Sequence, residues 1–138
     1  MFGMNDPNQT LMQLESYIRD GRLEMSEVMA TQFTDMFLQN KKRSEQDQIM
    51  LIRGLQILCD VLLMRNKVAL STTSAKTLLR ERKKIIQSNE MIGHYFQDLH
   101  RCAKCFALAG KKRKAKSFFV KAFKRSGGCL ASTLDGVL

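Results

Sequence analysis

The segment from Ser44 to Asn66 constrains the fold of this chain more than any other. Ser44 and Asp47 have the spacing of a capping box, which predicts that a helix starts here. Apolar residues then cover most of the circumference of that helix: Ile49, Met50, Leu51, Ile52, Leu55, Ile57, Leu58, Cys59, Val61, Leu62, Leu63 and Met64. A helix that is apolar nearly all round belongs in the centre of a bundle or in an oligomer interface. The sequence therefore predicts a central core helix over residues 45–66.

The residues before this segment predict two further helices. Asp6 and Pro7 indicate the start of a helix that Gly21 ends, and a second helix follows from about Ser26 to residue 40. The second helix carries several large apolar residues: Met25, Met29, Phe33, Met36 and Phe37. They predict a core face, with a partner groove or a dimer seam as the alternative.

The residues after the core helix also have a helical pattern. The polar run at 71–74 predicts a short link and a helix cap. Apolar residues then recur every seven positions from Leu78 to Phe106, which fits either one helix over 75–109 or two helices with a break at Ser88 and Asn89. Gly110 ends this region, and a last helix follows over 111–125.

The predicted fold is all-α, because the chain has one proline and no sustained strand pattern. We expect a compact bundle of five or six helices, with the apolar third helix in the centre and an antiparallel helical hairpin at the C-terminus. We predict a single domain over 1–126, with an acidic part at 7–40, the core helix at 45–66 and basic helices at 75–125. The residues 127–138 are predicted to form a flexible tail.

Charge is strongly segregated along the chain. Residues 1–40 carry two basic and six acidic side chains, whereas residues 99–134 carry ten Lys or Arg and no Asp or Glu. Such a block repels itself unless a polyanion or an acidic partner lies nearby. At helical spacing one stripe of cations consists of Lys76, Arg80, Lys83 and Lys84, and another of Arg113, Lys114, Lys121, Lys124 and Arg125. Together with Lys111 and Lys112, these are the candidate nucleic-acid-binding residues.

Two histidines and two cysteines, His94, His100, Cys102 and Cys105, have a spacing that resembles a zinc site. On a helix over 91–109, however, His100 points away from both cysteines, and His94 lies about 16 Å from Cys105 along the axis. We therefore prefer core thiols in a helix interface, with zinc as the alternative, and predict no cofactor.

The stretch LHRCAKCFALAGKKRKAKSFFVKAF, residues 99–123, resembles a single tetratricopeptide-type helical hairpin with Gly110 at its turn. Small and aromatic residues occupy the packing positions of that repeat: Leu99, Cys102, Ala103, Phe106, Ala115, Phe119 and Ala122. Leu99 stands at the usual Trp-like position, glycines replace the terminal proline, and the chain contains no second copy. Whether it reflects homology or convergence, the resemblance implies a binding module and no enzyme.

These features predict a non-enzymatic protein that grips the phosphate backbone of RNA or of a duplex. The sequence has no glycine-rich phosphate loop, nucleophile elbow or paired catalytic carboxylates. One alternative is a helical adaptor that binds an acidic protein segment through the C-terminal hairpin, and another is a protein that binds an anionic membrane surface through Phe118 or Phe123. We also expect a homo-oligomer, no transmembrane segment and no signal peptide. A cytoplasmic or nuclear location follows, with 111–114 as a nuclear-localisation run.

Overall fold

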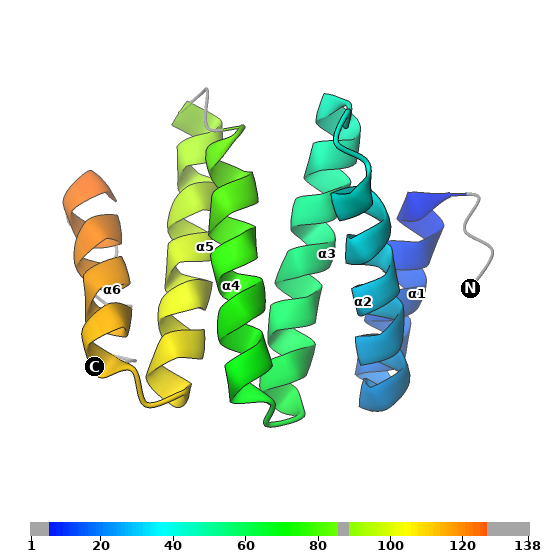
Figure 1. Ribbon diagram of the computed structural model, residues 1–138, viewed down its shortest axis with the longest axis horizontal. Coiled ribbons are helices and arrows are strands. Elements are labelled where there is room, and N and C mark those ends of the chain that lie inside the picture. The colour runs from blue at the N-terminus through cyan, green and yellow to red at the C-terminus, as the bar shows by residue number, and fades with distance from the viewer. Residues whose placement is uncertain (1–5, 86–88, 127–138) are drawn as a thin grey trace. The chain divides into compact units, whose positions relative to one another are not determined.

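The computed structural model of the chain describes residues 6–85 and 89–126. These residues form six helices and no strand (Figure 1), so the predicted all-α fold is confirmed. The helices are α1 (Pro7–Arg19), α2 (Leu23–Gln39), α3 (Glu45–Met64), α4 (Val68–Lys83), α5 (Asn89–Leu108) and α6 (Lys112–Ser126). The chain divides into two compact units of three helices, residues 1–67 and 68–138. The predicted single domain stays a prediction, and the predicted tail at 127–138 lies outside the described residues.

In the first unit, the predicted caps set the helix boundaries. The Asp6 carboxylate accepts a hydrogen bond from the Asn8 N–H at 3.0 Å, and Pro7 occupies the first turn of α1. Gly21 has φ +77°, a left-handed conformation that terminates helices and favours glycine. At the start of α3, the Ser44 hydroxyl accepts from the Asp47 N–H at 3.1 Å. Local chemistry in the sequence therefore fixes where α1 and α3 begin.

The core of the first unit lies where α2 packs against α1 and α3 (Figure 1). Leu14, Phe33 and Leu51 are completely buried. The third helix is the most extensively buried element of this unit, as its apolar pattern predicted: Gln48, Leu51, Ile52, Gly54, Leu55, Ile57, Leu58, Cys59, Val61 and Leu62 are all buried. Gly54 allows α2 and α3 to approach closely, because a Cβ atom there would lie 2.7 Å from Cδ1 of Phe33.

The second helix has two distinct faces. One face is buried and consists of Ser26, Met29, Ala30, Phe33, Thr34 and Phe37. On the other face, Met25, Val28 and Met36 are exposed. The sequence predicted a core face for the large apolar residues of α2, with a partner groove or a dimer seam as the alternative. In the structure Met29, Phe33 and Phe37 are buried in the core, whereas Met25 and Met36 are exposed.

In the second unit, α5 packs against both α4 and α6. The parallel helices α4 and α6 run opposite to α5 (Figure 1), so α5 and α6 form the predicted antiparallel hairpin. Leu78, Tyr95, Leu99, Phe106 and Phe119 are almost completely buried and form the core of this unit. The short turn after α5 contains Gly110 with φ +80°.

The predicted link at 71–74 is wrong, because these residues lie inside α4. Ser71 and Thr72 donate hydroxyl hydrogen bonds to the carbonyls of Val68 and Ala69, both at 2.7 Å. These bonds satisfy the hydroxyls within the helix, and both side chains are buried. Residues that favour caps and turns are thus accommodated as core-facing positions.

Of the two possibilities for residues 75–109, the structure has two separate helices. The first, α4, ends at Lys83, and the second, α5, begins at Asn89. The break was predicted at Ser88 and Asn89. Asn89 is the first residue of α5, and Ser88 lies outside the described residues.

Candidate functional site

Three of the candidate nucleic-acid-binding lysines gather around one aromatic ring. The Nζ atoms of Lys76, Lys111 and Lys114 lie 5.8, 5.7 and 5.2 Å from the ring centroid of Phe106. Lys76 belongs to α4, Lys111 to the turn after α5, and Lys114 to the first turn of α6. The ring of Phe106 is completely buried, so the lysines cover it while their own side chains stay exposed. We call these three lysines the Phe106 cluster.

The antiparallel hairpin explains why the two stripes meet. Since α4 and α6 start at the same end of the unit and α5 ends there (Figure 1), the first part of α4 lies near the start of α6 around the end of α5. Lys112 and Arg113 are exposed next to the cluster. The N-terminus of a helix carries a partial positive charge, and α6 has no acidic residue in its first turn.

The Phe106 cluster, Lys112 and Arg113 form no ion pair with a carboxylate within 6–85 and 89–126. Their mutual repulsion is therefore uncompensated within this part of the chain. An anion placed at this end of the unit would be attracted by several cations at once.

The other half of the first stripe differs from the prediction. Glu81, which is only 2% exposed, accepts a hydrogen bond from Arg80 Nε at 3.3 Å and forms an ion pair with Lys84 Nζ at 2.9 Å. A carboxylate inside the stripe thus partly neutralises two of its four cations. Lys76 and Lys83 are exposed. Among the described residues, positive charge without a carboxylate partner is consequently concentrated at the Phe106 cluster and reduced toward the end of α4.

A buried ion pair connects α4 and α5. Arg82 Nε donates to Asp98 Oδ2 at 2.6 Å, and the two side chains are 8% and 0% exposed. Arg101 Nη1 lies 3.6 Å from the other carboxylate oxygen of Asp98. The charge pattern did not reveal this pair, because Arg82 and Asp98 are 16 residues apart. The signal in the sequence that could have indicated their burial was position: Arg82 lies four residues after the core residue Leu78, and Asp98 directly precedes the core residue Leu99.

The predicted second stripe lies on α6. Arg113, Lys114 and Lys124 are exposed, whereas Lys121 is half-buried. The side chain of Arg125 lies outside the described residues. Opposite this stripe, Ala115 and Phe119 are buried against the rest of the unit.

The structure does not bring the candidate zinc ligands together. His94 is exposed, and the ring of His100 packs at a tilt against Phe119 with a centroid distance of 5.6 Å. Cys102 and Cys105 are both buried, and the Cys102 thiol donates to the carbonyl of Ala75 at 3.2 Å. Burial, with Cys105 and Asp98 nearby, raises the pKa of the Cys102 thiol. No group of three His, Cys, Asp or Glu among the described side chains is placed to hold a metal ion.

Partial burial of His100 predicts that the stability of the second unit depends on pH. Burial, followed by the charges of Lys104 and Arg101, lowers the pKa of His100 below its ordinary 6.5. The unfolded chain then takes up a proton more readily than the folded chain, so stability falls as the pH drops through this range. We expect a lower urea midpoint at about pH 5.5 than at about pH 7.5, and a smaller difference in His100→Gln. A His100→Gln variant with the same difference in urea midpoint as the wild type would contradict the assignment to His100.

Two acidic residues of the first unit are paired within that unit. Glu15 pairs with Arg53, and Glu27 accepts from Arg65 at 2.8 Å and from Lys67 at 3.0 Å. Burial alone would raise the pKa of Glu27, but the hydrogen bond and charge of Lys67, together with Arg65, lower it. Their partners are thus basic residues of α3 and of the turn that follows it.

Two observations bear on the predicted membrane alternative. None of the helices within the described ranges is both long and apolar enough to cross a membrane. Phe118, which would insert into a bilayer under the membrane alternative, is half-buried and packs against Phe106 at 5.3 Å between ring centroids; Phe123 has no described side chain.

Comparison with protein-family models, with curated proteins and with solved structures finds no match to this chain.

Proposed function

We propose that the protein is a non-enzymatic nucleic-acid-binding protein, with RNA as the favoured ligand. The observation that carries this proposal is the Phe106 cluster, in which Lys76, Lys111 and Lys114 surround one ring. Phosphate groups along a nucleic-acid backbone are spaced closely enough for several to meet such a cluster together. Lysine ammonium groups that already lie over a ring are held near the positions needed for binding, which lowers the entropic cost of the contact.

The chemistry of the cluster favours recognition of the backbone over recognition of bases. Lysine acts as a point charge toward phosphate, and Phe106 is buried beneath the ammonium groups, so its ring is not available to stack on a base. The exposed cations Lys112, Arg113 and Lys124 extend the charged surface along α6. Binding should therefore depend strongly on salt and weakly on sequence.

A salt titration tests the proposal. We expect labelled RNA to bind with an affinity that falls linearly on a plot of log K against log salt. Lys111→Glu/Lys114→Glu should weaken binding at least about tenfold at low salt and make the slope shallower by about 1 or more, because two phosphate contacts are lost. Fluorescence anisotropy with RNA and DNA of equal length measures both quantities.

The matched control is Lys41→Glu/Lys42→Glu, which makes the same change in net charge at two exposed residues after α2. This variant should bind nearly as well as the wild type. Equal losses in both variants would show that net charge alone attracts the nucleic acid, and would contradict a defined interface. Binding of an acidic peptide without binding of RNA or DNA would favour the helical adaptor instead.

A cytoplasmic or nuclear location accompanies this proposal. The run at 111–114 has the composition of a nuclear-localisation signal, and all four side chains are exposed. An import receptor needs such exposure to read the run. The same residues would then serve both nucleic-acid binding and import.

A further inference from the structure

The exposed face of α2 combines apolar and acidic residues and carries no cation. It carries Glu24, Met25, Val28, Gln32, Asp35 and Met36, which we call the α2 outer face. Met25, Val28 and Met36 are 47%, 51% and 38% exposed. The helix contains no Lys or Arg, and neither Glu24 nor Asp35 forms an ion pair within 6–85 and 89–126. The α2 outer face therefore presents exposed apolar side chains together with two carboxylates near its ends that are unpaired among the described residues.

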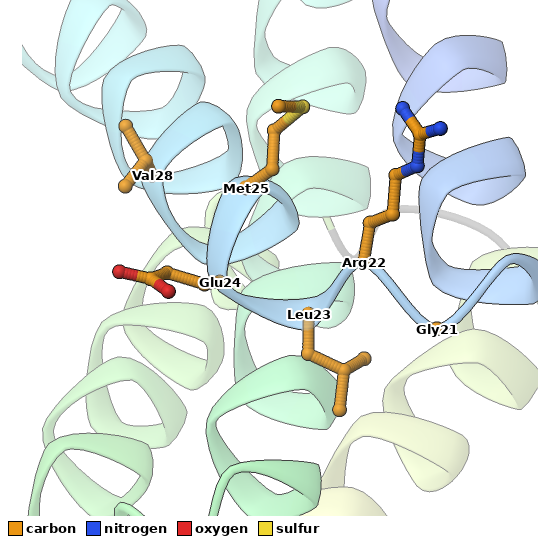
Figure 2. Close-up of a pocket in the computed structure, with 6 residues that line it drawn as sticks. All are labelled: Gly21, Arg22, Leu23, Glu24, Met25 and Val28. Carbon is orange, nitrogen blue, oxygen red and sulfur yellow. The ribbon is translucent and has the colours of Figure 1, made fainter.

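An open hollow adjoins the first turn of this face. Figure 2 shows its lining, which comes from one continuous segment: Gly21, Arg22, Leu23, Glu24, Met25 and Val28. In this view Glu24 and Val28 project on the same side of the helix. Methionine is flexible and polarisable, and exposed methionines are typical of surfaces that accept a helix.

The exposed face of α6 has the complementary composition. Val120 is 37% exposed, and Arg113, Lys116 and Lys124 are exposed on the same side of the helix. We call these four residues the α6 outer face. It is a small apolar centre between cations, where the α2 outer face is an apolar centre between carboxylates.

We propose that the α2 outer face of one copy binds the α6 outer face of a second copy. Glu24 and Asp35 are eleven residues apart, and so are Arg113 and Lys124. An interval of eleven residues is close to three turns, about 16 Å, so both members of each pair lie on one side of their helix. An antiparallel pairing can therefore satisfy both charges at once.

The register of this pairing also aligns the apolar centres. Placing Glu24 opposite Lys124 puts Asp35 opposite Arg113, and the same register puts Val28 opposite Val120. Met36 then lies opposite Lys112, whose methylene chain can cover it. A single register thus brings together two opposite-charge pairs and the two valines.

This contact has two consequences. The contact joins two different surfaces, so in a pair one copy still has a free α6 outer face and the other a free α2 outer face. Further copies can therefore add as the concentration rises, unless the chain of copies closes into a ring. Arg113 and Lys124 also belong to the surface proposed for nucleic acid. Self-association and nucleic-acid binding should therefore compete, although the self-association itself does not depend on the nucleic-acid proposal.

A charge-swap experiment tests the inference in the absence of nucleic acid. In sedimentation velocity, the wild-type chain should form larger species as its concentration rises at low salt, and these should dissociate at high salt. Glu24→Lys/Asp35→Lys should be monomeric, and so should Arg113→Glu/Lys124→Glu. An equimolar mixture of the two variants should associate again, because each acidic face then meets a basic one.

The mixture separates a specific contact from a general effect of charge. Circular dichroism of each variant should show unchanged helix content, since all four side chains are exposed. A wild-type chain that stays monomeric at high concentration and low salt would overturn the inference. Association that persists in either variant alone, or a mixture of folded variants that stays monomeric, would overturn it as well.

Discussion

Asp98→Ala should lower the free energy of unfolding of the second unit by about 3–5 kcal/mol. The carboxylate of Asp98 is completely buried and accepts from Arg82 Nε at 2.6 Å. Without it, the Arg82 guanidinium, which is 8% exposed, would keep an uncompensated charge inside the protein. Breaking a buried pair on one side costs far more than the pair contributes as a whole. Urea unfolding followed by circular dichroism, together with hydrogen exchange in α4 and α5, measures the loss.

Two other variants identify the cause of this loss. Lys83→Ala removes an exposed cation from the same helix, and should change stability by less than about 1 kcal/mol. Arg82→Met/Asp98→Leu removes both charges and should recover much of the stability lost in Asp98→Ala. A loss below about 1 kcal/mol in Asp98→Ala would contradict the role of the ion pair.

The boundaries of several helices could be predicted from sequence because the signals are local. Asp6 and Pro7 set the start of α1, Ser44 caps α3, and Gly21 and Gly110 adopt left-handed conformations at helix ends. Each signal acts through the residue's own backbone or through hydrogen bonds a few residues away. The burial of the helix predicted over 45–66 could also be predicted locally, because a helix with apolar residues around most of its circumference must be covered on most sides.

Helix interiors were harder to predict where Ser and Thr hydroxyls form hydrogen bonds with backbone carbonyls three or four residues earlier. Ser26 looked like the start of α2, but its hydroxyl donates to the Arg22 carbonyl at 2.7 Å from within the helix. Ser71 and Thr72 bond backward in the same way within α4. A hydroxyl that caps a helix and one that bonds within it have the same sequence pattern, and only the packing of the unit decides between them.

The candidate site combines a predictable part with an unpredictable one. The excess of cations after residue 99 was evident from composition, but their gathering depends on how the helices turn back on one another. Lys76 reaches Phe106 because α4 packs along α5, and that contact spans 30 residues. The neutralisation of Arg80 and Lys84 depends on Glu81, whose charge was hidden among cations in the same run. Spacing along one helix locates stripes, whereas contacts between helices decide which parts of them stay charged.

Gly54→Val should destabilise the first unit by about 3 kcal/mol. A Cβ atom at this position would lie 2.7 and 2.9 Å from Cδ1 and Cε1 of Phe33, and 3.1 Å from Cγ2 of Thr34. Phe33 is completely buried, so its ring has little room to move. Gly54→Ala should still lose about 1 kcal/mol, although alanine favours a helix interior by about 1 kcal/mol, because the overpacking outweighs that gain. Urea unfolding measures both variants, and Gln46→Ala at an exposed position of α3 serves as the control.

A double-mutant cycle shows whether the loss comes from the contact with Phe33. Phe33→Leu alone should cost about 1–2 kcal/mol, since it leaves space in a packed core. In combination with Gly54→Ala, the smaller side chain gives the new methyl group room, so the double variant should be more stable than the sum of the single changes by about 0.5 kcal/mol or more. Additive losses would mean that the two positions do not press on each other, and the close approach of α2 and α3 at Gly54 would then need another explanation. A favourable coupling would instead show that a missing side chain at Gly54 sets the distance between the two helices.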